Sequence, residues 1–167
     1  ILNFSAADGS LSFENDLPLS AVSSVTTDGV YDVEWSPNGQ YLYLSHSGDD
    51  GQPDLLQYDL ANLASGNTIV SPVSVLPQPN TVTASYGLQT GPDGAIYHLY
   101  ESGGQINMGR INAPDSAAAL VNYEQDAVAG PFGATQFPSF VPGQTPSITI
   151  DFEATGCVNV PTQLFPT

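Results

Sequence analysis

The sequence contains no lysine and a single arginine, Arg110, against 17 aspartate and glutamate residues, so its formal charge is −16. Proteins that bind nucleic acid neutralise phosphates with lysine and arginine, and this chain lacks those side chains. A phosphate-binding P-loop, a Schiff-base enzyme and a Ser–Lys hydrolase each require a lysine. The composition therefore excludes these classes, and it argues equally against attraction to an anionic membrane surface.

Long apolar runs and helical periodicity are also missing. No apolar run approaches the ~18 residues that a membrane span requires, so we predict no span. The 16 glycines and 14 prolines are spread along the chain and interrupt most stretches of helical length. One helical turn is expected within residues 115–122, where Asp115 and Ser116 can cap it. Hydrophobic residues make up 41% of the chain, which is enough for a packed core.

Strand signals dominate what remains. Short segments rich in β-branched and aromatic residues lie between turn residues and predict an all-β fold. The predicted strands are 30–35, 41–45, 55–60, 69–76, 84–88, 96–100 and 105–111.

An internal repeat is the most informative feature of the sequence. Residues 29–44 align with residues 84–99, so that Tyr31 falls on Tyr86 and Val33 on Leu88, with one residue deleted in the second copy. The period is about 55 residues, near the upper end of the range for four-stranded propeller blades. Both copies carry a Pro-Asn-Gly or Pro-Asp-Gly sequence, which favours a tight hairpin turn. Segments 55–60 and 105–111 are then expected as the outer strands of two successive blades.

Several motifs resemble the WD-repeat-like propeller of large secreted Bacteroidota surface proteins. These motifs lie at residues 31–45, 55–60, 88–97, 111–123 and 136–141. The resemblance covers about residues 1–142 and implies the C-terminal blades of a β-propeller. It also implies an extracellular location on the bacterial cell surface, export by the type IX secretion system, and an association with PKD modules and gliding motility.

Residues 143–167 differ in character from the blades. A linker-type stretch at 142–146 precedes an alternating, strand-like segment at 147–152. This part resembles the opening of a PKD-like, immunoglobulin-type sandwich, in which an early cysteine often pairs with a later one. The resemblance implies that Cys157 forms a disulfide with a partner beyond residue 167. We therefore expect two to three four-stranded antiparallel blades followed by a linker and the first strand of a PKD/Ig-like module, in a fragment of a longer protein.

Three carboxylates lie close together in the loop 47–54, namely Asp49, Asp50 and Asp54. Oxygen-rich loops of this kind bind Ca²⁺, which takes 6–8 oxygen ligands. The spacing is not that of an EF-hand, and Asp-Asp-Gly is also a common turn. A solvated loop between strands is the favoured interpretation, and Ca²⁺ binding is the alternative; no other cofactor is predicted.

The remaining polar and aromatic residues do not form a catalytic motif. His46 and His98 have no metal-ligand spacing, so a surface or strand-end position is favoured over a catalytic one. Asp32 and Glu34 lie two apart on one strand face, as glycosidase acids can, but the repeat does not keep them as a pair. Trp35 and the strand tyrosines are expected to pack between blades, with a sugar-stacking platform as the alternative.

These observations favour a non-catalytic structural or adhesive segment of a secreted, multidomain cell-surface protein. Its propeller would be a rigid scaffold that displays acidic loops to glycans or proteins, in contact with other blades of the same protein. The sequence Asp-Ser-Ala at 115–117 resembles a Bacteroidota O-glycosylation site, which implies a glycan on Ser116. One alternative is a propeller enzyme of the lactonase, lyase or glycosidase kind with its active site mostly in other blades. Another is a substrate or accessory protein of the type IX translocon.

Overall fold

The computed structural model describes residues 2–13, 29–46, 54–61, 72–138, 152–153 and 165–166. The chain divides into two compact units, Ile1–Phe137 and Pro138–Thr167. The predicted boundary after residue 142 lies outside the described residues. Within the described part, no helix is long and apolar enough to cross a bilayer.

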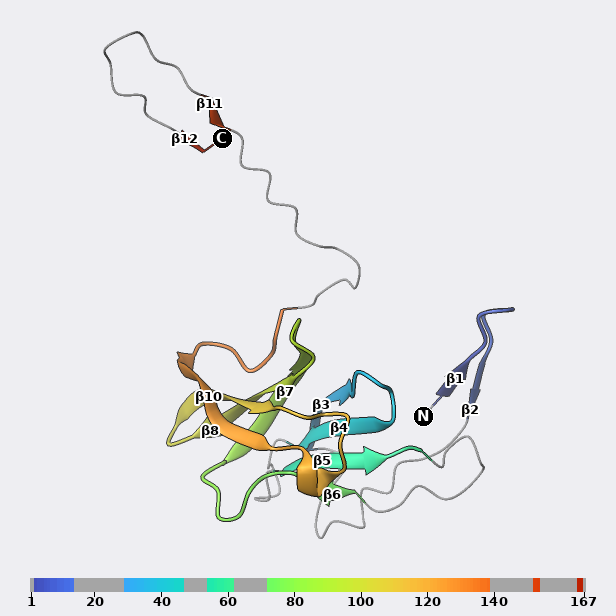
Figure 1. The fold of residues 1–167 in the computed structure, drawn as a ribbon, viewed down its shortest axis with the longest axis horizontal. Coiled ribbons are helices and arrows are strands. Elements are labelled where there is room, and N and C mark those ends of the chain that lie inside the picture. Colours follow the sequence, from blue (N-terminus) through green and yellow to red (C-terminus); the bar gives the residue numbers. More distant parts are fainter. Residues whose placement is uncertain are drawn as a thin grey trace. The chain divides into compact units, whose positions relative to one another are not determined.

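The larger unit contains two four-stranded antiparallel sheets, and neither of them closes on itself (Figure 1). The first sheet has the order β3 (Val30–Trp35), β4 (Tyr41–His46), β5 (Asp54–Asp59) and β6 (Val73–Ser74). The second sheet has the order β7 (Ala84–Thr90), β8 (Ile96–Ser102), β9 (Gln105–Ile111) and β10 (Tyr123–Phe132). Each strand pairs with the next one along the chain, so both sheets are simple meanders, and the all-β prediction is confirmed.

The two copies of the sequence repeat form equivalent hairpins, β3–β4 and β7–β8. Gly39 and Gly94 occupy the turns with φ of +72° and +77°, a conformation that glycine adopts without strain. The predicted Pro-Asn/Asp-Gly turns are therefore confirmed. The Ser36 amide donates to Tyr41 in the first hairpin, and the Gly91 amide donates to Ala95 in the second, which is one residue shorter, as the alignment predicts.

The expected outer strands are wrong in one respect. Segments 55–60 and 105–111 form β5 and β9, which are the third strands of their sheets, and β6 and β10 lie outside them. β10 was not predicted because its pattern is irregular. Its register against β9 shifts twice between Glu124 and Phe132, and Asp126 has a φ of +58°. Alternation of apolar and polar residues is lost across such bulges.

The one predicted helical turn is present as a 3₁₀ turn, Ala118–Leu120, between β9 and β10. Its N-cap residue is Ala117, and no side chain caps it. The expected capping by Asp115 and Ser116 is therefore wrong, because Asp115 bonds to a distant turn instead.

Two short strand pairs complete the described elements. β1 (Leu2–Phe4) pairs antiparallel with β2 (Leu11–Phe13). In the smaller unit, β11 (Phe152–Glu153) pairs antiparallel with β12 (Phe165–Pro166). Whether these pairs belong to an earlier blade and to a PKD-like module stays a prediction.

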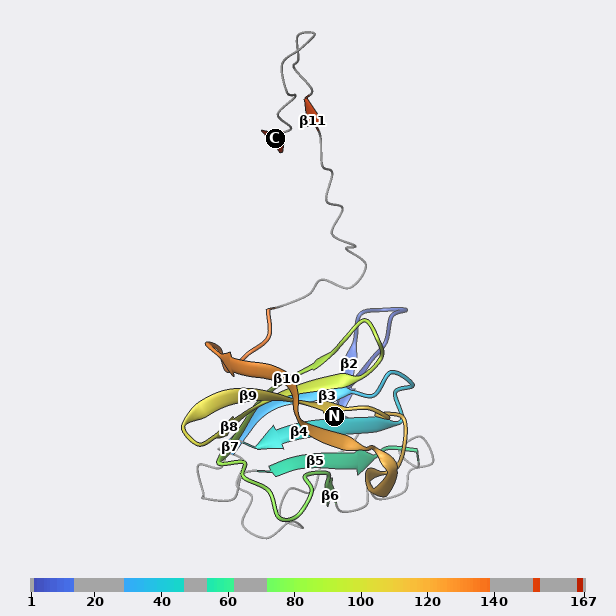
Figure 2. The same cartoon turned by 60° about the vertical axis from the view of Figure 1, so that its left-hand side comes forward.

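The two large sheets pack against each other through β7, which contacts β3, β4 and β5 (Figure 2). One apolar cluster joins the two sheets. Its buried members are Tyr41, Tyr43, Leu55, Val75, Leu76, Val82, Leu88, Ile96, Tyr100, Ile111 and Val121. A second cluster lies on the opposite face of the first sheet and contains Leu42, Leu44, Leu56, Tyr58 and Leu60.

The repeat alignment shows which faces meet. We call the face that carries Asp32 and Glu34 the front of the first sheet, and the face that carries Val33 and Trp35 its back. Leu88 aligns with Val33, so the back of the second sheet is the face that carries Leu88. Because Leu88 belongs to the cluster between the sheets and Asp32 bonds to its amide, the front of the first sheet packs on the back of the second.

Candidate functional site: a polar seam between the sheets

Asp32 joins the two sheets at their edge strands. Its Oδ1 accepts a hydrogen bond from the Val33 amide of the same strand, and its Oδ2 accepts one from the Leu88 amide of β7, each at 2.9 Å. Val33 and Leu88 are equivalent positions of the repeat. In the second copy, the position of Asp32 is taken by Gly87, which has no side chain that could accept from the Leu88 amide. The Asp32 carboxylate therefore accepts from both the Val33 amide and the Leu88 amide.

Glu34 makes a second link across the same seam. Its Oε1 accepts a hydrogen bond from the Thr90 hydroxyl at 2.9 Å. Burial is the main cause that raises the pKa of the Glu34 carboxyl, and the Asp32 charge acts in the same direction. The two carboxylates do lie on one strand face, as the sequence predicts, but each binds a group of β7. This use is structural, and it differs from the paired acids of a glycosidase, which flank a substrate.

Aromatic side chains also pack in this seam. The rings of the equivalent residues Tyr31 and Tyr86 lie edge to face with centroids 5.1 Å apart, which is a favoured geometry for aromatic pairs. The Tyr31 hydroxyl bonds to the Thr135 hydroxyl at 2.7 Å, and the Gly87 amide donates to the Thr135 carbonyl at 2.9 Å. The prediction of packing between sheets is confirmed for this pair. Trp35, by contrast, is 45% exposed.

The loop between β9 and β10 reaches across to the first sheet. The Asn38 amide donates to Asp115 Oδ1 at 2.9 Å, and the Tyr43 hydroxyl donates to the Pro114 carbonyl at 2.8 Å. Gln57 Nε2 donates to the Ser116 carbonyl at 2.8 Å. The backbone around Ser116 is thus fixed and the residue is half-buried. Its glycosylation stays a prediction.

A buried hydrogen-bonded chain centres on His98. Its Nε2 lies 2.6 Å from the Ser85 hydroxyl on β7, and its Nδ1 lies 2.8 Å from the Tyr123 hydroxyl on β10. Burial lowers the pKa of the His98 imidazole to about 3, so the ring is neutral at physiological pH. The strand-end position expected for His46 is confirmed, since His46 ends β4, although its side chain is fully buried. The expected surface or strand-end position is wrong for His98, which lies within β8 and is fully buried.

A serine next to a histidine is the pairing used in nucleophilic catalysis. Here both Ser85 and His98 have no exposed surface, so no substrate can reach them in this conformation. A neutral imidazole donates one hydrogen bond and accepts another, which matches its two partners. Sequence reasoning missed this pair, although a signal was present: Ser85 and His98 lie on the two strands of one predicted hairpin.

Asp126 fixes β10 to β8. Its carboxylate accepts a hydrogen bond from the Tyr100 hydroxyl, and its own amide donates to the same hydroxyl at 3.2 Å. Burial, followed by the bond to Asp126, raises the pKa of Tyr100 to about 12. This polar contact holds the bulged part of β10 to the sheet.

The predicted calcium loop is only partly described. Asp49 and Asp50 lie outside the described residues. Asp54 Oδ1 accepts from the Leu55 amide at 2.8 Å and from the Ser74 hydroxyl at 2.5 Å, which links β5 to β6. Burial raises the pKa of this carboxyl. Among the residues that the structure describes, no three His, Cys, Asp or Glu side chains gather as metal ligands. Calcium binding stays a prediction.

Cys157, the cysteine of the predicted disulfide, also lies outside the described residues.

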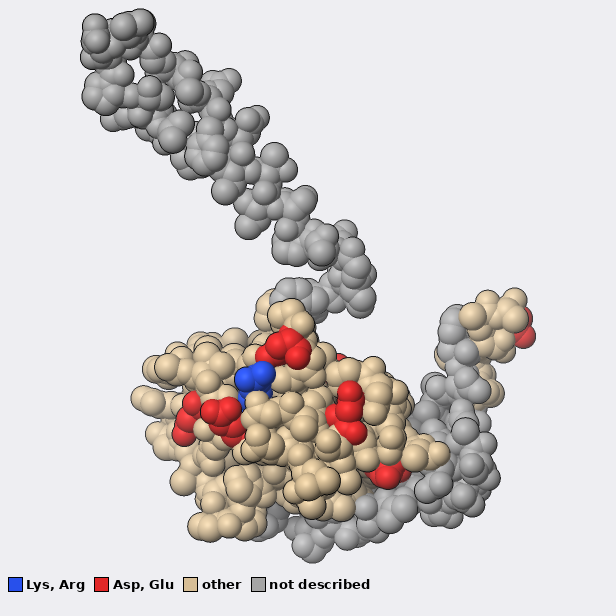
Figure 3. Space-filling model, in the orientation of Figure 1, with Lys and Arg blue, Asp and Glu red and all other residues tan. Residues whose placement is uncertain are grey.

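Arg110, the only arginine, is held in a small surface cluster. Its Nη2 lies 2.7 Å from Asp93 Oδ2, and its guanidinium carbon lies 5.8 Å from the centre of the Tyr97 ring. The Tyr97 hydroxyl donates to the same carboxylate oxygen at 2.9 Å, and this bond is the main cause that lowers the pKa of Asp93. On the face shown in Figure 3, the acidic side chains stand in several separate places. On this face, the described carboxylates therefore stand singly and do not form one acidic patch.

Comparison of the chain with models of protein families, with curated proteins and with solved structures finds no match.

Proposed function

We propose that the chain is part of a β-propeller of an extracellular, cell-surface protein and acts as a rigid, non-catalytic scaffold that displays loops to a binding partner. The observation that carries this proposal is the front-to-back packing of two repeat-related sheets. In a face-to-face sandwich, equivalent faces would meet. Front-to-back packing instead leaves room for further sheets in the same order, which is how blades follow one another in a propeller.

Two exposed carboxylates support a display role because ordered neighbours hold them. Asp93, in the turn of the second hairpin, is fixed by Tyr97 and Arg110. Asp115, in the loop after β9, is fixed by the amide of Asn38. A preorganised side chain loses less conformational entropy on binding than a free one. These positions suit contacts with the hydroxyl groups of a glycan or the polar surface of a protein.

The buried environment of Ser85 and His98 favours a scaffold over the enzyme alternative, since it leaves this pair closed to substrates. The seam carboxylates Asp32 and Glu34 are likewise engaged by β7. The proposal for the wider protein includes export by the type IX system and a following PKD-like module, and it rests on the resemblance of the sequence motifs. Association with the secretion translocon remains the further alternative.

A binding experiment on the intact chain tests the display role. The labelled chain is applied to a glycan array and to Bacteroidota cells, and it is assayed in parallel for turnover of ester, lactone and glycoside substrates. We expect binding without turnover. Asp93→Asn should reduce binding, whereas Glu124→Gln, which removes a charge from strand β10, should not. Turnover of any of these substrates, or an absence of binding to every surface, would contradict the proposal.

A further inference from the structure

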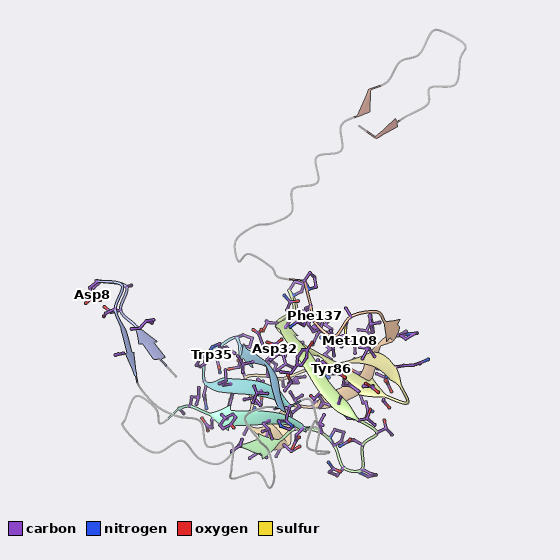
Figure 4. All side chains as sticks on the ribbon, turned by 180° about the vertical axis from the view of Figure 1, so that it is seen from behind. Asp8, Asp32, Trp35, Tyr86, Met108 and Phe137 are labelled. Carbon is purple, nitrogen blue, oxygen red and sulfur yellow. The ribbon has the colours of Figure 1, made fainter. Side chains whose placement is uncertain are left out.

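The turn between β3 and β4 contains Asn38 and Gly39, which form the only Asn-Gly pair in the sequence. Figure 4 labels Asp32 and Trp35 on β3, and the turn begins directly after Trp35. Both residues of the pair are exposed, and a Cβ added at Gly39 would meet nothing within 4 Å. Solvent therefore reaches this pair in the folded chain.

An asparagine followed by glycine deamidates without an enzyme, because glycine has no side chain to obstruct attack by its amide nitrogen. Here the Gly39 nitrogen would attack the Cγ atom of Asn38. A bond from this nitrogen to Cγ forms, the bond from Cγ to the side-chain nitrogen breaks, and the side-chain nitrogen leaves as ammonia with the proton of the Gly39 amide. Water then opens the cyclic imide to aspartate or to isoaspartate, in which the backbone runs through Cβ.

Hydrogen bonds of the turn hold both reacting groups. The Gly39 amide donates to the Ser36 carbonyl at 2.8 Å. Asn38 Oδ1 accepts from the Ser36 hydroxyl at 2.8 Å and from the Gln40 amide at 2.9 Å. Imide formation requires the Gly39 amide to leave its acceptor and the Asn38 side chain to turn toward it. The turn must therefore open before the reaction takes place.

Asn38 also fastens the loop between β9 and β10 to the first sheet. Its backbone amide donates to Asp115 Oδ1 at 2.9 Å. Because this bond joins the tip of one sheet to a loop of the other, it adds a restraint from outside the turn. Its loss should make local opening of the turn more frequent.

We propose that Asn38 is a site of spontaneous deamidation, that the closed turn and Asp115 hold the reaction in check, and that isoaspartate at this position releases the β9–β10 loop from the first sheet. This inference goes beyond the proposed scaffold role and does not depend on it. It assigns a covalent modification that needs water alone as co-reactant.

The two products should differ in their effect on the turn. Isoaspartate lengthens the backbone between residues 38 and 39 by a methylene group and so displaces the amides that follow. Aspartate leaves the backbone unchanged, and the second copy of the repeat shows that a carboxylate suits this turn. There, Asp93 Oδ1 accepts from the amide two residues farther on, as Asn38 Oδ1 does in the first copy.

Peptide mapping of the complete chain measures the reaction. The chain is incubated at mildly alkaline pH, either folded in buffer or unfolded in guanidinium chloride, and chymotrypsin then releases residues 36–41 by cleavage after Trp35 and Tyr41. Mass spectrometry measures the deamidated fraction, and enzymatic methylation detects isoaspartate. We expect deamidation in the unfolded chain and a rate at least about tenfold lower in the folded chain, because local opening precedes the reaction.

Two variants of Asp115 test the contact between the loop and the turn. Asp115→Ala removes the acceptor of the Asn38 amide, so the folded variant should deamidate about threefold faster or more than the unchanged chain. Asp115→Asn keeps an acceptor oxygen and should react at close to the rate of the unchanged chain. In guanidinium chloride, the three chains should react at the same rate.

Hydrogen exchange shows the consequence for the turn. Chains deamidated during long incubation of the folded protein are separated into the aspartate and isoaspartate forms. The aspartate form should protect the amides of Gly39 and Gln40 as the unmodified chain does. The isoaspartate form should exchange both amides rapidly.

Any one of four results would overturn the inference. These are an unfolded chain that does not deamidate at Asn38, equal rates in the folded and unfolded chains, and equal rates in folded Asp115→Ala and Asp115→Asn. The fourth is an isoaspartate form whose turn amides exchange as slowly as those of the unmodified chain.

Discussion

Replacement of Asp32 by alanine should destabilise the packing of the two sheets more than the loss of any exposed acid. The carboxylate binds two backbone amides, one from each sheet, at 2.9 Å. Leu88 is only 4% exposed, so its amide would be left without an acceptor in a buried place. Val33 is half-exposed, and water can replace the lost bond there.

The magnitude follows from these two environments. A buried amide that loses its partner costs about 1–3 kcal/mol, and a hydrogen bond to a charged acceptor contributes about 1.5–3 kcal/mol. The free energy of unfolding should therefore fall by about 2–4 kcal/mol in Asp32→Ala, most of it from Leu88. With a urea dependence of about 2 kcal/mol per molar, the unfolding midpoint shifts by about 1–2 M.

Urea unfolding followed by the fluorescence of Trp35 measures this shift. Glu124→Ala is the matched control, because it removes the same charge from an exposed position on β10. In a chain of formal charge −16, this change relieves repulsion and should leave the midpoint unchanged or slightly higher. The reasoning is refuted if Asp32→Ala unfolds at the same urea concentration as Glu124→Ala.

Two further predictions concern the chain of hydrogen bonds around His98. Burial lowers the pKa of His98 to about 3, below its usual value in the unfolded chain. The contribution of the neutral ring to the free energy of unfolding is therefore complete above about pH 6.5, and it falls by about 1.4 kcal/mol per pH unit as the pH drops toward 3. An NMR titration should show no protonation of the His98 ring between about pH 8 and 5, and a midpoint near about 6.5 would contradict this. A Cβ at Gly109 would lie 2.2 Å from the Tyr123 hydroxyl oxygen, so Gly109→Ala should lower the free energy of unfolding by about 1–3 kcal/mol, measured by heat or urea. Gly133→Ala is the control and should be near neutral, because a Cβ there meets nothing within 4 Å. Equal effects of the two substitutions would be inconsistent with the packing described.

The regular hairpins were predictable from the sequence because local signals agree with tertiary structure there. In 30–35 and 84–88, β-branched and aromatic residues precede a Pro-Asn/Asp-Gly turn, and the repeat fixes the pairing. β10 was not predictable in the same way. Its bulges and the positive φ of Asp126 depend on the partner strand and on the hydrogen bond from Tyr100.

The seam was only partly predictable. The sequence shows Asp32 and Glu34 on one strand face, but it does not show that β7 would lie opposite them. The burial of His98 was missed because single-sequence reasoning treats a histidine as polar. Its alignment with the apolar Leu44 of the first copy was a signal for burial. Its partners come from β7 and from the irregular β10, so the chain of bonds exists only once the sheet is assembled.

Front-to-back packing of the repeat-related sheets is the central claim, and NMR through-space contacts in the isotopically labelled chain test it most directly. The account predicts contacts between the side chains of Glu34 and Thr90, and between the side-chain protons of Asp32 and the Leu88 amide proton. It predicts no contacts from the side chains of Val33 or Trp35 to side chains of β7. Contacts between the side chains of Trp35 and Thr90, or between those of Val33 and Leu88, would place equivalent faces together and contradict the account.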